Sequence, residues 1–259
     1  MLAFIQAHRI AFMTILMKEI RRFMRIWTQT LLPPAITMTL YFIIFGSLIG
    51  SRIGEMSGIS YMAFITPGLI MMSVINNAYS NVSSSFFSNK FQRSVEELLV
   101  APLPNSVILA GFVLGGVARG LITGLIVTLV ALFFTDILIF NFWVLSSVVF
   151  LSSVLFSLAG FINALYATKF DDVSIVPTFL LTPLSYLGGV FFSTALLPEG
   201  WRIVSEFNPI LYMVNGFRYG MLGVSDVSLT ACYAILISII VALFLLSMKL
   251  LNSGKGIRP

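Results

Sequence analysis

The stretch NKFQRSVEELLVAPLP, residues 89–104, separates two long apolar runs and holds four charged side chains in a chain that is only 10% charged. An ionised side chain in the middle of a bilayer is costly, so this stretch does not lie in hydrocarbon. It is also far too short to fold as a domain of its own. The apolar runs on either side are therefore expected to cross a membrane, and the stretch to connect them outside it.

The composition of the whole chain agrees with a membrane protein. Of its 259 residues 58% are hydrophobic, with 24 Phe and 12 Met, and the mean hydropathy is +1.01. Soluble domains are nearer half apolar and about a quarter charged. The net charge of +5 is better explained by basic residues that face anionic lipid than by nucleic-acid binding. We therefore expect membrane lipid as a partner and no nucleic acid.

Six apolar stretches are long enough to span a bilayer. A spanning helix needs about 20 mainly apolar residues, since roughly 30 Å of hydrocarbon is crossed at about 1.5 Å per residue. We predict an all-α integral membrane protein with six transmembrane helices, in a domain covering residues 30–251. The predicted spans are Thr30–Gly50, Tyr61–Ser84, Val107–Thr135, Phe142–Ala167, Val173–Ser193 and Ser228–Leu251.

The basic residues fall unevenly on the two sides of these spans. One side carries most of the fifteen Lys and Arg, and the other carries Arg52, Arg202 and Arg218. Since cytoplasmic loops are enriched in Lys and Arg, both termini and the stretch 89–104 are predicted to be cytoplasmic. The residues on the richer side are Arg9, Lys18, Arg21, Arg22, Arg25, Lys90, Arg93, Lys169, Lys249, Lys255 and Arg258.

The first 29 residues have the pattern of an amphipathic helix. Basic residues at 18, 21, 22 and 25 form one stripe, and Leu16, Ile20, Phe23 and Trp27 form another. We expect this helix to lie flat at the membrane surface with its apolar side down. It is either a simple interfacial anchor or also part of a docking surface for a cytoplasmic partner. Residues 252–259 are expected to form a cytoplasmic tail.

The connection at 89–104 has a helical pattern of its own. Phe91, Val95, Leu98 and Leu99 share one side, and Arg93 and Glu97 are spaced to pair. Pro102 and Pro104 should end the helix. The connection is either a solvated turn or a short cytoplasmic helix that offers apolar side chains and carboxylates to a partner.

Several segments, in order along nearly the whole chain, resemble the permease subunits of type-2 ABC exporters of the bacterial inner membrane. RSVEELLVAPLP is similar to that family's first cytoplasmic connection, and FITPGLIMMSVI to its second span. FDDVSIVPTFLLTPLSYLGGVFFSTALLP resembles the fifth span with the outer segment after it, and NPILYMVNGFRYG a signature before the last span.

The resemblance implies a function and a set of partners. Two permeases would pair, and each would engage a separate ATP-binding cassette subunit. Residues 89–103 would be the coupling helix, inserted into a groove of that ATPase. Its contacts would be made by Phe91, Arg93, Glu96, Glu97 and Leu98.

The chain itself has no pattern of an enzyme. The string LLNSGKG lacks the first glycine and the final Ser or Thr of a phosphate-binding loop. A single His8 and a single Cys232 cannot supply the ligands of a usual zinc site. We expect no catalytic residue, metal or cofactor here, and ATP with Mg²⁺ in the partner subunit. The alternatives are an ATP-independent secondary transporter or channel, or a membrane assembly scaffold, although no Asp or Glu lies well inside a predicted span.

Polar and small residues inside the spans leave two interpretations each. Ser73, Asn77, Ser80 and Ser84 share one helix face and either bond neighbouring helices or line an export route. Arg119 needs a carboxylate, a carbonyl or water, or reaches the cytoplasmic interface. The glycines around it have spacings that favour close helix packing; they are Gly111, Gly115, Gly116, Gly120 and Gly124.

The last third of the chain holds a kinked span and a broken outer segment. Asp171 and Asp172 either begin the fifth helix or contact the ATPase. Pro177 and Pro183 should kink this helix, which is either closely packed or a moving gate. The resemblance implies two re-entrant helices, broken at Asn208-Pro209, that form an outer lid. Arg218 there would bond the lid's carbonyls or contact cargo. Nothing in the sequence selects the cargo.

Overall fold

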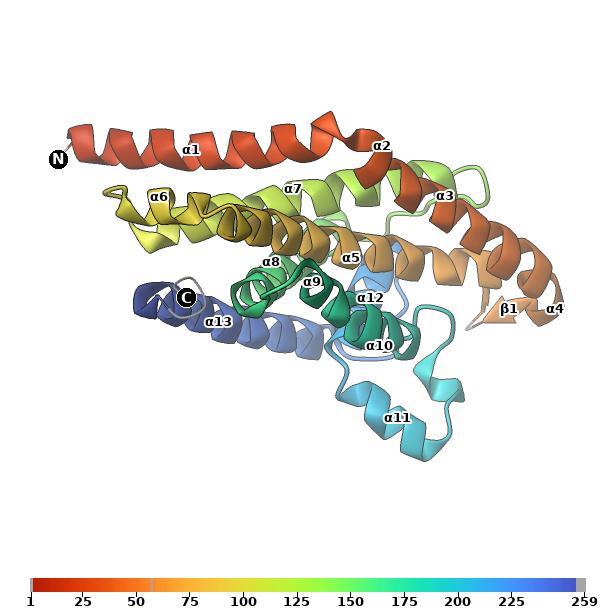
Figure 1. Cartoon of the computed structure of the whole chain (residues 1–259). Coiled ribbons are helices and arrows are strands. Elements are labelled where there is room, and N and C mark those ends of the chain that lie inside the picture. Colours follow the sequence, from red (N-terminus) through yellow and green to blue (C-terminus); the bar gives the residue numbers. More distant parts are fainter. Residues whose placement is uncertain (1, 57, 255–259) are drawn as a thin grey trace.

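The computed structural model describes residues 2–56 and 58–254, and the described chain is almost entirely helical (Figure 1). A two-stranded antiparallel hairpin pairs Glu55 with Ser60. The elements are α1 (Leu2–Arg25), α2 (Trp27–Thr30), α3 (Leu32–Tyr41), η1 (Phe42–Ile49), α4 (Gly50–Ile53), β1 (Glu55–Met56), β2 (Ile59–Ser60), α5 (Tyr61–Phe91), α6 (Ser94–Val100), α7 (Asn105–Ala131), α8 (Phe142–Tyr166), α9 (Phe170–Val176), η2 (Pro177–Leu181), α10 (Thr182–Leu187), η3 (Thr194–Leu196), α11 (Glu199–Glu206), α12 (Pro209–Leu222) and α13 (Leu229–Ser253).

Five helices are long and apolar enough to cross a membrane. The first runs through α2, α3, the π-helical segment η1 and α4, from Trp27 to Ile53, and the others are α5, α7, α8 and α13. They coincide with five of the six predicted spans, with ends shifted by several residues. The all-α membrane architecture expected from the sequence is therefore present.

The fifth predicted span, Val173–Ser193, is not one long helix. It consists of α9, the π-helical turn η2 and α10, which ends at Leu187. The reason is local, because Pro177 and Pro183 have no backbone N–H to donate. Gly189 then takes a φ of +71°, a conformation that side-chain-bearing residues rarely adopt. The segment is helical from Phe170 to Leu187, with a π-helical turn in its middle, and it is shorter than the five long helices.

The start of α1 and the end of α13 lie at the same end of the molecule, together with α6 (Figure 1). The hairpin and α4 lie at the opposite end. The segment α9–η2–α10 is not among the helices that are long and apolar enough to cross a membrane.

Helix α5 is the centre of the bundle and packs closely on α7 and α8. A Cβ added at Gly116 of α7 would lie 2.9 Å from the Ala78 carbonyl oxygen. One added at Gly160 of α8 would lie 2.5 Å from the Tyr79 carbonyl oxygen. The predicted role of the α7 glycines in close packing is confirmed, since only a hydrogen fits at these crossings.

Helix α1 packs lengthwise against α7, so its buried face is covered by protein. Ile15, Glu19 and Phe23 are buried, and a Cβ at Gly111 or Gly115 would collide with Ile15 or Glu19 respectively. Of the predicted apolar stripe, Phe23 is buried, Leu16 and Ile20 are partly buried beside the packed face, and Trp27 is 52% exposed. The stripe and the packed face differ because a buried carboxylate occupies the middle of that face.

Candidate functional site

The connection 89–104 forms a short helix at the end of the molecule where both termini lie (Figure 1). α5 continues to Phe91, and α6 covers only Ser94–Val100 of the predicted 89–103. Arg93 stands between the two helices in the left-handed conformation, with φ of 59°. Ala101 is extended, and Pro102 and Pro104 follow it. The prolines therefore end the helix as predicted.

The side chains of α6 divide into a packed and a free set. Val95 is buried and Leu98 is partly buried against the same apolar cluster. Glu96 and Glu97 are exposed, and Val100 is 86% exposed. Of the predicted contact residues, Leu98 thus faces the bundle more than a partner. The side chain of Leu99 lies outside the described part.

The predicted Arg93–Glu97 pair is absent among the described side chains. It requires both residues on one continuous helix, and Arg93 precedes α6 in a left-handed conformation instead. Phe91 is exposed and lies against Phe170 of α9, with ring centroids 5.0 Å apart. The two rings form an aromatic surface beside α6.

Polar contacts join α6 to the end of α5, and the end of α5 to α1 and α8. The Ser94 hydroxyl donates to the main-chain and side-chain oxygens of Asn89, at 3.1 and 3.2 Å. Lys18 of α1 donates to the same Asn89 side chain at 2.7 Å. Lys90 donates to the carbonyls of Leu165 and Ala167 at the end of α8. Movement of α6 is thereby tied to α1 and α8.

A buried carboxylate that the sequence reasoning missed continues this network. The Ser85 hydroxyl donates to Glu19 Oε1 at 2.7 Å, and Arg22 lies 3.4 Å from Oε2. Arg22 also donates to the Asn81 side chain and carbonyl at 2.9 Å. Polar residues at 81, 85 and 89 repeat every fourth position, a spacing that marks one face of a helix. That spacing was the available signal for a polar contact with α1.

Asp172 begins α9, as the simpler of its two interpretations predicts. Its carboxylate accepts from the backbone N–H groups of Thr168 and Lys169 and from the Thr168 hydroxyl, at 2.8–3.0 Å. These donors, with the charge of Lys169, hold the pKa of the Asp172 carboxyl below its usual value. Asp171 is exposed beside it.

A groove of about 420 Å³ opens between the first span, α5, α7 and α10. Most of the residues that line it have polar side chains, and almost none of them is charged. The lining residues are Gln29, Thr30, Pro33, Pro34, Thr37, Met38, Tyr41, Met72, Ser73, Asn76, Asn77, Arg119, Thr182 and Tyr186. Tyr41 and Tyr186 meet across it, with their hydroxyl oxygens 3.2 Å apart.

Three predicted residues, two from α5 and one from α7, meet in this groove. Arg119 donates to the Asn77 side-chain oxygen at 3.0 Å and weakly to the Thr30 carbonyl at 3.4 Å. Ser73 lies one turn from Asn77 and is buried. Arg119 therefore stays among the helices and has a carbonyl and an amide as partners, with no carboxylate.

The other predicted polar positions lie outside the groove lining. Ser84 donates to the Ser80 carbonyl of its own helix at 2.6 Å, and both residues are partly exposed. Pro183 is exposed on the outer side of α10. The shared helix face of Ser73, Asn77, Ser80 and Ser84 thus has only its first two members in the groove.

The predicted outer lid is held together by buried polar contacts. Arg218 of α12 is 1% exposed, donates to the Gly189 carbonyl and to Asn215 Oδ1, and lies 4.0 Å from the Phe64 ring centroid. Asn208 caps α12 and donates to the Leu184 carbonyl at 2.6 Å. These contacts favour the structural interpretation of Arg218.

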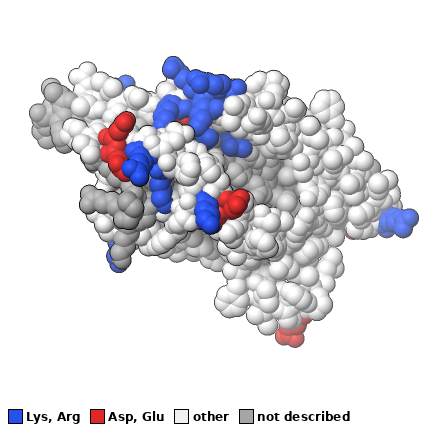
Figure 2. All heavy atoms as spheres, in the orientation of Figure 1, with Lys and Arg blue, Asp and Glu red and all other residues white. Residues whose placement is uncertain are grey.

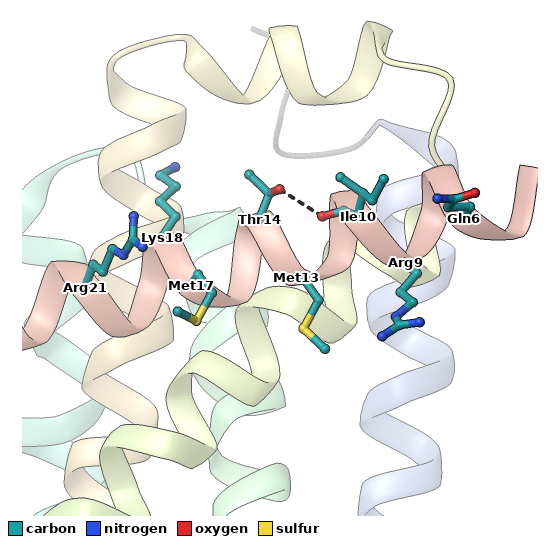
Figure 3. Close-up of a pocket in the computed structure, with 8 residues that line it drawn as sticks. All are labelled: Gln6, Arg9, Ile10, Met13, Thr14, Met17, Lys18 and Arg21. Carbon is teal, nitrogen blue, oxygen red and sulfur yellow. Dashed lines mark hydrogen bonds between the residues drawn. The ribbon is translucent and has the colours of Figure 1, made fainter. Parts of the chain in front are cut away.

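The outward face of α1 carries basic side chains with apolar side chains between them. Figure 3 shows side chains along one side of α1, with Lys18 and Arg21 near one end and Arg9 toward the other. Ile10, Met13 and Met17 lie exposed between them. On the face drawn in Figure 2, Lys and Arg gather over the half of the molecule that contains α1 and α6. The distribution agrees with the bias seen in the sequence.

Comparison with known proteins decides the family. The sequence model of the ABC-2 type transporter matches residues 10–222, which includes α6, the groove and the lid. The chain belongs to the ABC-2 type transporter family. It is also 59% identical, over 249 residues, to the inner membrane transport permease YadH of Escherichia coli K12. The match covers 96% of this chain and 97% of that protein, and the same values hold for YadH of Shigella flexneri.

Proposed function

We propose that the chain is the membrane-spanning permease subunit of an ATP-driven ABC exporter in the bacterial inner membrane, with both termini in the cytoplasm. Membership of the ABC-2 family and the printed name of the YadH relatives support this assignment. The gathering of basic residues at the α6 end supports the orientation. Lipid is its solvent, and ATP with Mg²⁺ is bound by a separate subunit.

The proposal includes six membrane crossings and an outer re-entrant pair. The interrupted segment α9–η2–α10 is the fifth crossing. α12 then packs beside the first half of α8, where a Cβ at Gly216 or Gly220 would touch Val148 or Leu145. Ile210, at the start of α12, lies deeper, in a cavity with Leu155. The chain thus enters and leaves from the same side through α11 and α12.

The exposed side of α6 is the proposed contact with the ATP-binding cassette subunit. The single observation that carries this is a short helix fixed at its base by Asn89 and Lys90, with two carboxylates and Val100 free on its outer side. Charges at the rim of an interface set register and partner choice, and a buried apolar residue adds affinity. Phe91 and Arg93 complete the surface.

A second copy of the permease is part of the proposal. The groove is open on one side, and the elements that border it, α3 with η1 and η2 with α10, expose apolar residues such as Leu40 and Phe179. A second permease facing this side would close the groove into a pathway. Closure of the ATPase dimer would then move α6, and α1 and α8 with it, to open the path.

The test is capture of an ATPase by the affinity-tagged permease from detergent-solubilised bacterial membranes. Glu97→Arg combined with Val100→Asp changes only exposed side chains, so folding should be retained. We expect captured ATPase activity to fall at least tenfold, because one carboxylate is reversed and one apolar contact is charged. The matched control, Glu55→Arg with Ile53→Asp, changes exposed residues at the opposite end of the molecule and should capture as much as wild type.

The outcomes separate the competing functions. Equal capture by both variants would place the ATPase contact elsewhere while leaving the exporter intact. If the wild-type chain captures no ATPase in any mild detergent, the exporter is excluded in favour of a secondary transporter, a channel or an assembly scaffold.

A further inference from the structure

The groove holds one charged side chain, and nothing in its lining neutralises it. Among the described residues that line the groove, Arg119 is the only ionisable side chain that is charged at neutral pH. Its hydrogen-bond partners are an amide oxygen and a carbonyl oxygen. A guanidinium held among membrane helices is costly without an anion, so ionised side chains there usually have a charged partner or water.

The neighbouring charged residues do not neutralise Arg119. Arg22 has the same sign, and its own charge is paired with that of Glu19 on the α1 side. The Glu19 carboxylate also accepts from the Ser85 hydroxyl, so it is engaged on that side. Since Arg22 and Glu19 balance each other, the uncompensated positive charge at the groove is that of Arg119 itself.

Two donors on residues that line the groove are buried and have no partner in the described structure. They are Arg119 Nε and the hydroxyl of Ser73, which is 1% exposed. Leaving a buried donor unpaired costs about 1–3 kcal/mol. The amides of Asn76 and Asn77 each donate one hydrogen bond within α5 and have a second N–H, and the Thr37 hydroxyl lies around the same space. The Thr182 hydroxyl donates to the Pro177 carbonyl of its own helix. The lining thus has donors left for a ligand, although fewer than its polar residues suggest.

We propose that the groove binds an oxyanion group of the transported molecule, a phosphate or a carboxylate, and that Arg119 and Ser73 are its specificity-determining residues. The inference rests on the proposed transport function and names the chemical class of the cargo. Arg119 supplies the charge and a planar set of donors, which suits an oxyanion. The neutral donors around it suit the remaining oxygens. A cationic cargo would be repelled.

The experiment follows contact between a labelled lipid and Trp27, which lies two residues from Gln29 of the lining. The exposed Trp143 and Trp201 are replaced by Phe, so Trp27 is the remaining tryptophan of the three. The full chain is reconstituted into vesicles, and quenching by brominated phosphatidylglycerol is compared with quenching by brominated diacylglycerol, which has no phosphate. We expect the anionic lipid to be preferred at least fivefold, and Arg119→Gln to abolish the preference.

Two variants separate a site from surface attraction. Arg119→Lys keeps the charge and should retain most of the preference. Arg25→Gln removes an exposed charge only two residues from Trp27 and should leave it unchanged. Inorganic phosphate is then added at constant ionic strength. Displacement of the lipid, dependent on Arg119, identifies a soluble oxyanion as an equal ligand, whereas no displacement identifies the lipid headgroup.

The proposal is overturned if wild type shows no preference, if Arg119→Gln keeps it, or if Arg25→Gln loses it equally. The binding measurement needs no ATPase. Failure of this inference and failure of the exporter assignment are therefore distinguished, because ATPase capture is measured separately.

Discussion

Replacing Arg218 by methionine should lower the free energy of unfolding by about 3 kcal/mol. The change removes both donors to Gly189 and Asn215 and the contact with the Phe64 ring. The Gly189 carbonyl left unpaired costs about 1–3 kcal/mol, and a desolvated cation–π contact contributes about 2 kcal/mol. Removing a buried charge offsets part of this loss.

The loss of the Arg218 contacts should also weaken other hydrogen bonds of the lid. Asn215 Oδ1 also accepts from the Asp226 backbone N–H, and the Asp226 carboxylate accepts from Ser193 and Thr194. Thermal unfolding of the detergent-solubilised protein measures the effect. Arg202→Met is the control, since its ion pair with Glu206 is exposed and worth about 0–1 kcal/mol. Equal melting temperatures for the two variants would contradict a structural role for Arg218.

Replacing Gly160 by leucine should prevent accumulation of folded protein. A Cβ at this position would lie 2.5 Å from the Tyr79 carbonyl oxygen and 3.3 Å from the Ser83 backbone nitrogen. Both are backbone atoms of α5, which no rotamer change can move. Overpacking commonly costs about 1–3 kcal/mol, and separating the two central helices should reach or exceed that range.

The comparison for Gly160→Leu is Gly200→Leu on α11, where an added Cβ meets nothing within 4 Å. Monodisperse yield after solubilisation is the measurement. The control should be recovered at the wild-type level, because its new side chain enters open space. A wild-type yield for Gly160→Leu would show that α5 and α8 can separate without penalty, which the packing does not allow.

The sequence was a good guide wherever one pattern outweighs all others. Twenty-residue apolar runs predicted five helices, and the proline pair after Ala101 ended α6. Reasoning from the pattern failed where tertiary contacts override it. Arg93 leaves the helical conformation to separate α5 from α6, so its spacing from Glu97 predicted a pair that does not form. The position of Glu19 in the packed face of α1 was not predicted, because its partner Ser85 is 66 positions away in the chain.

The candidate site was predicted in part. Ser73, Asn77 and Arg119 meet in the groove, but the sequence could not place Gln29 or Thr182 beside them, since these come from separate helices. Helical spacing shows which residues share a face of a helix. It does not show which part of that face borders the groove. Ser80 and Ser84 share the face with Asn77 and lie beyond the groove.

The two π-helical segments adjoin the elements that hold Tyr41 and Tyr186, and each allows part of its helix to rotate about the helix axis without a shift of the helix ends. A π turn holds one residue more than an α turn, and such insertions often occur at functional positions. η1 directly follows Tyr41, and η2 lies just before the helix that holds Tyr186. When such an insertion migrates along its helix, each residue it passes rotates by about 100° while the helix ends stay in place. Migration of the π insertion would rotate Tyr41 or Tyr186 away from the other tyrosine. The hydrogen bonds at the helix ends would stay in place.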